Sequence, residues 1–143
     1  VNVNFYPRFI DPAYLRAALV AERPLAAERE ALIAAGREPA AADTEIEGRL
    51  AELTPRLPAT PLSVLIDHFD HVATVAGVDH VGLGSDFDGI SAVPEGLDDV
   101  TGLPVVAQAL LDRGYSAVDV TKVLGGNMMR VIEQVLDRGV AAE

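Results

Sequence analysis

Cysteine and tryptophan are absent from this sequence, and lysine occurs only once, as Lys122. Without cysteine the chain can form no disulfide, no thiolate nucleophile and no cysteine-based zinc site. Positive charge is scarce as well, because 22 Asp and Glu stand against 11 Lys and Arg, for a formal net charge of −11. This charge repels phosphate backbones and anionic membranes, so no nucleic-acid partner is expected. No apolar run approaches the ~20 residues of a membrane span.

The 143 residues are enough for one domain, and 50% of them are hydrophobic, which predicts a globular chain with a core. Position 1 is valine, and Val1–Phe5 already alternates apolar and polar residues like a strand. We therefore expect the back part of a longer protein, with any targeting segment outside the chain. The sequence leaves the compartment undetermined, and the cytoplasm is the expectation.

Hydrophobic spacing predicts a β-α-β unit. Residues 1–5 form its first strand, and Thr60 and Pro61 are typical of the start of a helix over 61–76. The apolar residues of that helix fall on one stripe: Leu62, Leu65, Ile66, Phe69, Val72, Ala73 and Ala76. Val78–Leu83 follows as a short, mostly apolar second strand, so the fold class is α/β and the sheet is expected to be parallel.

Residues 11–60 are expected to be an insertion, most of it helical. Asp11 and Pro12 predict a helix start, and Pro24 is expected to divide residues 13–35 into two helices. A loop over 36–43, a short helix over 44–53 and a proline-bearing stretch over 54–61 complete the insertion. It is a solvated acidic segment, or else a lid or a subunit contact.

Residues 1–143 are expected to form one structural portion. Its last βα units and its closing helices are expected over residues 61–136. A helix over 104–113 ends at Gly114, and Ser116 with Asp119 resembles a capping box for a helix that runs toward Leu124. Gly125, Gly126 and Asn127 interrupt it, and residues 128–136 form a last amphipathic helix.

Asp67-His68-Phe69-Asp70-His71 is the densest cluster of metal-binding residue types. His68 and His71 lie three apart on a helix, but a zinc site needs a third ligand. The one other histidine, His80, begins a strand, whereas sites form where strands end. We favour histidines satisfied by structural hydrogen bonds over a metal site.

Asp86 and Asp88 emerge where the second strand ends, which is where chemistry collects in α/β sheets. A calcium loop is rejected because Leu97 stands where its last acidic ligand belongs. The motif also resembles the haloacid-dehalogenase-like magnesium phosphohydrolases, with Asp86 as nucleophile and Asp88 as general acid. Ile90 replaces the following threonine, and that family's further residues would have to be Lys122 and Asp98-Asp99.

A second resemblance covers far more of the chain. It is to the membrane (renal-type) dipeptidases, peptidase family M19, and five blocks in register carry it: Val3–Pro7, Asp67–Val72 with Val75–Gly77, Val81–Gly89, Pro94–Asp99, and Leu124–Asn127 with Met129–Val131. The insertion and the last few residues fall outside these blocks.

This resemblance implies the C-terminal part of a TIM-like (β/α)₈ barrel of the metallo-dependent hydrolase type: its last two βα units plus the C-terminal helices. Val1–Phe5 would be the seventh strand and Val78–Leu83 the eighth. It also implies two zinc ions bridged by a glutamate, with every metal ligand upstream of this chain. The implied partner is a dipeptide substrate, and a homodimer is the assembly considered.

By the same resemblance, Asp86 faces the dipeptide's amino group and the proton in transfer, and Asn4 and Tyr6 line the pocket. Asp88 is expected to shape the loop by accepting backbone N–H bonds. Alone, the chain is expected to be inactive and poorly soluble or oligomeric. The alternatives are a magnesium phosphohydrolase and a non-catalytic remnant or interaction domain.

Overall fold

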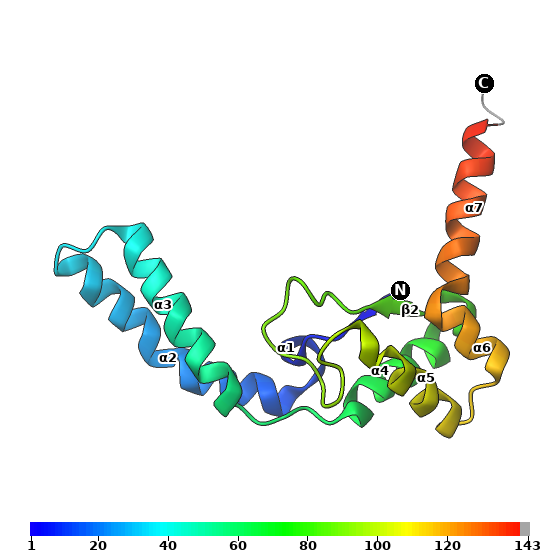
Figure 1. The fold of residues 1–143 in the computed structure, drawn as a ribbon, viewed down its shortest axis with the longest axis horizontal. Helices are drawn as coiled ribbons and strands as arrows, with labels where there is room; N and C mark the ends of the chain where they lie inside the picture. The colour runs from blue at the N-terminus through cyan, green and yellow to red at the C-terminus, as the bar shows by residue number, and fades with distance from the viewer. Residues whose placement is uncertain (141–143) are drawn as a thin grey trace.

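In the computed structural model, which describes the backbone of residues 1–140 and the side chains of residues 1–137, a small sheet lies between two helical projections (Figure 1). Helices α4 and α5 pack beside the sheet, the α2–α3 hairpin extends at one end and α7 projects at the other. The larger elements are β1 (Asn2–Asn4), α1 (Pro7–Ile10), α2 (Pro12–Ala34), α3 (Pro39–Leu53), α4 (Leu62–Ala76), β2 (Gly82–Gly84), α5 (Leu103–Asp112), α6 (Ala117–Thr121) and α7 (Asn127–Val140). No helix within the described range combines the length and apolar character needed to cross a bilayer.

Strands β1 and β2 are parallel, as predicted, and pair in the register Asn2 to Gly82 and Asn4 to Gly84. The second strand is shorter than predicted, because residues 78–80 form a 3-10 turn, η2 (Val78–His80). The carbonyls of Val78 and Val81 both accept hydrogen bonds from Nδ2 of Asn127, each at 2.8 Å. The Asn127 side chain therefore occupies carbonyls that would be available for strand pairing if β2 began earlier.

The two faces of this sheet differ in chemistry. Val3 and Leu83 share the face that packs on α4 and α5, where Val3, Phe5 and Val81 are buried with residues from the helices. The helix residues in that core are Leu65, Ile66, Phe69, Val106 and Leu110. The opposite face carries Asn2, Asn4, Gly82 and Gly84, as the period-2 alternation requires. The helix stripe predicted for α4 is confirmed except at Ala76, which is exposed.

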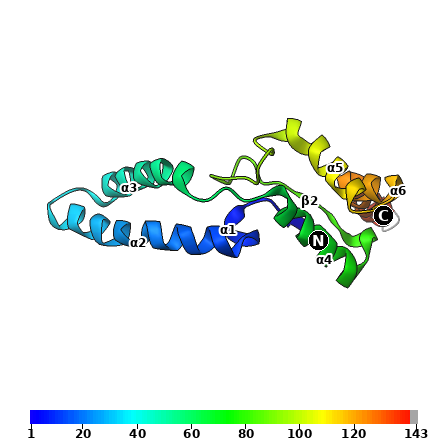
Figure 2. The same cartoon turned by 90° about the horizontal axis from the view of Figure 1, so that it is seen from below.

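The predicted break at Pro24 is wrong, since α2 runs unbroken from Pro12 to Ala34. A proline lacks the N–H that would bond the carbonyl four residues earlier, here that of Val20. Val20 is 74% exposed, so water can reach that turn of the helix, and the break is avoided. The predicted loop over 36–43 is also too long, because Pro39 already opens α3. Figure 2 shows α2 and α3 side by side, extended away from the sheet.

The junction between hairpin and sheet is built on Asp11. Its Oδ1 accepts the Ala13 N–H at 2.8 Å, which confirms the predicted N-cap of α2. Thr60 does not cap α4 as predicted; its Oγ1 donates instead to Asp11 Oδ2 at 2.8 Å. The Thr60 carbonyl accepts the Glu95 N–H at 2.9 Å, so the same link reaches the loop that follows β2.

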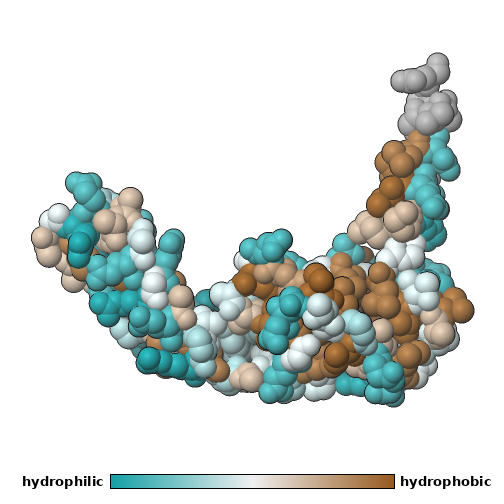
Figure 3. All heavy atoms as spheres, in the orientation of Figure 1, coloured by the Kyte–Doolittle hydropathy of each residue, from teal (hydrophilic) through white to brown (hydrophobic). Residues whose placement is uncertain are grey.

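The closing helices begin and end near the predicted capping and glycine residues. Ser116 caps α6 by accepting the Asp119 N–H at 3.1 Å. The segment η4 (Lys122–Gly126) then joins α6 to α7 across a kink, where Gly125 adopts a non-helical backbone with a φ of 149°. The exposed apolar side chains of α7 recur at helical spacing: Met128, Val131, Ile132, Val135 and Leu136. Figure 3 shows apolar residues along one side of α7 and polar residues along the other.

Candidate active site

The carboxyl ends of β1 and β2 bring together two of the predicted site residues. Asn4 is the last residue of β1, and Asp86 follows the end of β2 by two residues. Asn4 Nδ2 donates to Asp86 Oδ2 at 3.4 Å across the ends of the strands. Asp86 is exposed and Asn4 is half-buried, so the carboxylate is accessible from solvent while its neighbour is partly covered.

The backbone at Asp86 is left-handed, with a φ of 58°, and among the described residues no other non-glycine has a positive φ. This conformation costs about 1–3 kcal/mol and persists only where the surroundings hold it. Gly89 supplies part of that support, because its N–H donates to the Asp86 carbonyl at 2.9 Å. A Cβ at Gly89 would lie 2.5 Å from Asp86 Oδ1, so only glycine lets the carboxylate rest there.

An aromatic pair anchors this loop to the core. The rings of Phe5 and Phe87 meet edge to face, with centroids 5.8 Å apart and an interplanar angle of 84°. Phe5 is fully buried directly after β1, whereas Phe87 is half-buried directly after Asp86. The residue next to the carboxylate is therefore tied to the residue next to Asn4.

Tyr6, which the resemblance implies as a pocket residue, lies at the same edge. Its backbone N–H donates to Asn4 Oδ1 at 2.7 Å, and its hydroxyl lies 3.5 Å from Ser91 Oγ on the loop after β2. Its ring meets that of Phe9 edge to face at 5.3 Å, and Phe9 is 71% exposed. Sequence reasoning missed Ser91 and Phe9. Their signals are weak: Ser91 follows Asp86 by five residues, and Phe9 follows Tyr6 by three.

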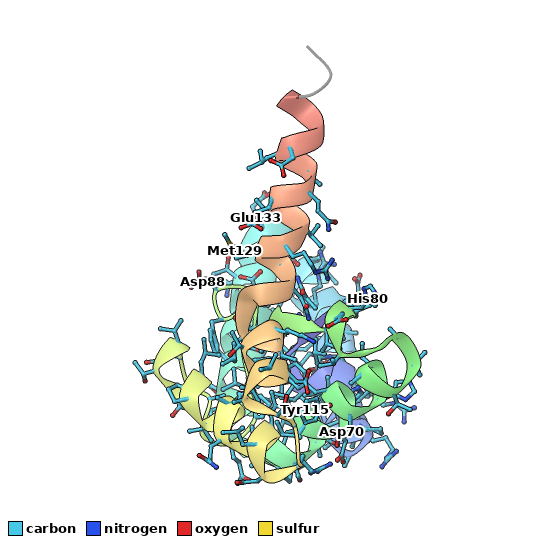
Figure 4. The ribbon with its side chains drawn as sticks, turned by 90° about the vertical axis from the view of Figure 1, so that its right-hand side faces the viewer. Asp70, His80, Asp88, Tyr115, Met129 and Glu133 are labelled. Carbon is cyan, nitrogen blue, oxygen red and sulfur yellow. The ribbon has the colours of Figure 1, made fainter. Side chains whose placement is uncertain are left out.

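The loop-shaping role predicted for Asp88 is wrong. Its side chain is exposed and makes no hydrogen bond to the described residues. Figure 4 shows Asp88 on the loop, well away from Asp70 on α4 and from Tyr115 in the connection between α5 and α6. The loop is held instead by Asp86, through its backbone carbonyl and its contact with Gly89.

Of the two histidines on α4, His68 forms a structural hydrogen bond and His71 is exposed. His68 Nε2 lies 2.8 Å from the Ile10 carbonyl, which ties α4 to α1. Arg113 donates to Asp67 at 2.7 Å and to Asp70 at 2.5 Å. Burial, together with the nearby Asp70 carboxylate, raises the pKa of Tyr115 to about 12. Within the part of the chain that the structure describes, no three His, Cys, Asp or Glu side chains gather as a metal site.

The residues required for a phosphohydrolase are not assembled. Lys122 lies beside the amino end of β2, where its Nζ contacts Asp79 at 2.7 Å and Asp119 at 3.4 Å. Its hydrogen bond to Asp79 raises the pKa of Lys122. Asp99 accepts from the Thr101 backbone at 2.7 Å and caps a short turn, η3 (Val100–Gly102). The predicted lysine thus lies at the wrong end of the strand for chemistry at Asp86.

A hollow of about 260 Å³ lies at the amino ends of the strands, between Val1, Asp79, Asn127 and Arg130. Parallel sheets place their chemistry at the opposite, carboxyl ends. Asn127 is already engaged there in holding two carbonyls, and the Arg130 guanidinium donates to the Asp79 carbonyl at 2.6 Å. We therefore place the candidate site at Asp86 and not in this hollow.

Similarity to known proteins covers nearly the whole chain. Dipeptidase aclJ of Aspergillus oryzae is 49% identical over 77 residues, which are 54% of this chain and 18% of that protein. Dipeptidase 3 of Mus musculus is 43% identical over 74 residues, 52% of this chain and 15% of that protein. The crystal structure of the probable dipeptidase PvdM from Pseudomonas aeruginosa matches with a TM-score of 0.70 at 27% identity, covering 90% of this chain and 35% of that one.

The chain spans less than a fifth of the length of these two curated relatives and about a third of the PvdM chain. The family model described as membrane dipeptidase, peptidase family M19, matches residues 1–141. The chain therefore belongs to the membrane dipeptidase family.

Proposed function

We propose that this chain is the C-terminal part of a zinc-dependent dipeptidase that hydrolyses the single peptide bond of a dipeptide. The observation that carries the proposal is the placement of Asp86: an exposed carboxylate just past the end of β2, supported by Asn4 from the neighbouring strand. Membership of the dipeptidase family supplies the reaction class.

We assign β1 and β2 to the last two strands of a (β/α)₈ barrel. They are parallel, their helices lie on one face, and the other face carries small and polar residues suited to a barrel interior. Within the described residues each strand is paired along one edge only. The free edges and the exposed apolar side of α7 are the surfaces that the rest of such a barrel would cover.

Asp86 has two tasks in this proposal. Hydrolysis adds water across the C–N bond, so the carbonyl carbon gains the hydroxyl and a proton must reach the departing amine nitrogen. A carboxylate beside that nitrogen can carry the proton. The same negative charge attracts the free ammonium group of a dipeptide, and within the described residues no Lys, Arg or His bonds to Asp86 and cancels it.

The residues described here do not fit a zinc site. His68 is engaged with the Ile10 carbonyl. The other two histidines, His71 on α4 and His80 before β2, are exposed, and His80 lies at the amino end of β2, opposite to the end where Asp86 lies. No metal-binding group is formed among residues 1–137. We therefore assign the zinc ligands to the part of the enzyme that is not in this sequence.

The first test compares this chain with the full-length enzyme, meaning the same residues joined to the remaining strands of the barrel. We expect zinc-dependent hydrolysis of a dipeptide such as alanyl-alanine by the full-length enzyme only. Hydrolysis by residues 1–143 alone with added zinc would contradict the proposal, because the metal site would then have to lie within them.

The second test replaces the carboxylate in the full-length enzyme. Asp86→Asn keeps the shape and removes the charge, so we expect kcat/KM to fall by about 10²- to 10⁴-fold. Asp88→Asn is the matched control, two residues away, exposed and outside the site. An Asp86→Asn enzyme with full activity would eliminate the proposal. A wild-type enzyme without activity on any dipeptide would favour a non-catalytic domain.

A further inference from the structure

The oxygen and the nitrogen of the Asn4 side-chain amide both form hydrogen bonds within the protein. Asn4 therefore differs from a substrate-binding residue whose polar atoms have no partner in the protein. Its Oδ1 accepts the Tyr6 N–H at 2.7 Å, and its Nδ2 donates to Asp86 Oδ2 at 3.4 Å. The first contact fixes the orientation of the amide, because a backbone N–H can only donate and must therefore face the oxygen. The NH₂ group is left pointing at Asp86.

The carboxylate of Asp86 is confined from two sides. Its Oδ1 lies against Gly89, so close that a Cβ there would be 2.5 Å away, and its Oδ2 meets the Asn4 amide. The left-handed backbone, with a φ of 58°, sets the direction in which the side chain leaves the chain. The two oxygens thus have different neighbours, and the carboxylate has one preferred orientation.

We propose that Asn4 is a positioning residue, which acts through Asp86 by holding its carboxylate in the orientation that meets the ammonium group and the leaving amine of the dipeptide. This inference rests on the proposed function. A neutral donor suits the task, because a lysine or arginine at position 4 would cancel the charge offered to the substrate. A second acid there would repel Asp86.

The decisive variant is Asn4→Asp in the full-length enzyme. Aspartate still accepts the Tyr6 N–H, so the fold of the β1 end is retained, and only the donor to Asp86 is lost. Two carboxylates at this separation cannot both ionise without cost, so we expect the acid limb of the kcat/KM profile to move up by about one pH unit. At neutral pH, kcat/KM is expected to fall about 10- to 100-fold, because the proton-carrying group is no longer held in place.

The chain contains a matched control in Asn2→Asp. Asn2 lies on the same strand and the same face and pairs with Gly82, two residues before the partner of Asn4. The added charge is therefore about 6–7 Å further along the strand. We expect its acid limb to move by less than about 0.3 of a pH unit, since charges at longer range in water are screened.

If Asn4→Asp lowers the melting temperature enough to obscure activity, Asn4→Ser replaces it, because serine is too short to reach Asp86 and adds no charge. Asn4→Ser is expected to lower kcat/KM about tenfold or more, with its acid limb moved less than that of Asn4→Asp because no charge is added. Equal profiles for Asn4→Asp and Asn2→Asp, or full activity of Asn4→Ser, would overturn the inference. Asp86→Asn separates the two proposals: if it is inactive while both Asn4 variants behave as wild type, only the role of Asn4 fails.

Discussion

The sheet with helices α4 to α6 is held together by buried apolar side chains, whereas the α2–α3 hairpin is held mainly by exposed ion pairs. In the sheet region Phe5, Leu65 and Phe69 are fully buried within one continuous core. Across the hairpin the buried contacts are small, at Leu25 and Ala42. Its ion pairs join Arg29 to Asp43, Arg49 to Glu28 and Arg37 to Glu45.

This difference indicates what each region does. Apolar burial contributes about 25 cal/mol per Å² and fixes positions within a packed core, while exposed ion pairs contribute little. The candidate site belongs to the packed region, through Phe5 and Phe87, so its geometry depends on the core. One hydrogen-bonded link from the hairpin to this region runs through Asp11 and Thr60 and continues to Glu95 in the loop after β2. A second contact joins Glu22 of α2 to Arg8 of α1.

The largest expected effect comes from Phe5→Ala, which opens a cavity in the packed region. Phe5 is 0% exposed, so its loss should lower the free energy of unfolding by about 3–5 kcal/mol, as measured by urea denaturation of the full-length enzyme. Phe87 loses its partner in the same variant, so dipeptidase activity should fall as well. Phe9→Ala is the control, since Phe9 is 71% exposed. Equal destabilisation by the two variants would show that the core is not centred on the sheet.

Local rules predicted the elements that local contacts decide. The apolar stripe of α4 and the alternation of β1 were sufficient for a parallel β-α-β unit, because each pattern has one period and one face. The predicted parallel pairing also accounts for the contact between Asn4 and Asp86, since the carboxyl ends of the two strands lie side by side. The net charge and the absence of cysteine excluded classes of partner and of site, but they did not locate any functional residue.

Contacts distant in the chain decided the rest. Asn127 donates hydrogen bonds to the carbonyls of Val78 and Val81, so β2 begins later than predicted. No sequence pattern near residue 80 indicates this. Thr60 resembles a helix cap but bonds to Asp11, which lies 49 residues away. Asp88 was expected to shape the loop, but Gly89 lies against the Asp86 carboxylate and donates to the Asp86 carbonyl, a placement that the local sequence does not indicate.

An intermediate effect is expected at the junction, where Asp11→Ala removes both the cap of α2 and the partner of the Thr60 hydroxyl. We expect a loss of about 1–3 kcal/mol in unfolding free energy, less than for Phe5→Ala. Asp11→Asn, which can still cap α2, should lose less. A neutral effect of Asp11→Ala would mean that the hairpin is joined to the sheet by other contacts.

The Asp11 carboxylate also leads us to expect that the stability of the fold depends on pH. Burial raises the pKa of Asp11, but the hydrogen bonds from Thr60 and from the Ala13 N–H outweigh burial, and the pKa lies below its ordinary value. A depressed pKa stabilises the fold above the unfolded value of about 3.9, and this stabilisation is lost as the pH falls through the folded pKa. The difference in stability between wild type and Asp11→Asn should therefore be largest near neutral pH and shrink below about pH 4. A difference that grows on acidification would contradict this sign.

The smallest effect is expected within the hairpin itself, at Asp43→Asn. Asp43 accepts from Arg29 Nε at 2.6 Å, and this hydrogen bond lowers the pKa of Asp43 and raises that of Arg29. Asp43 is exposed and Arg29 is half-buried at the surface, so water and salt screen their attraction. Thermal unfolding should place the variant close to wild type in low salt, and the remaining difference should vanish in 1 M NaCl, where the Debye length is about 3 Å. Glu47→Gln, on the same helix and exposed, controls for the change in net charge. If Asp43→Asn instead destabilised the protein as much as Asp11→Ala, ion pairs would hold the hairpin as firmly as the junction does. The contrast between the two regions would then be one of composition alone, because charge would be doing in the hairpin what apolar burial does around the sheet.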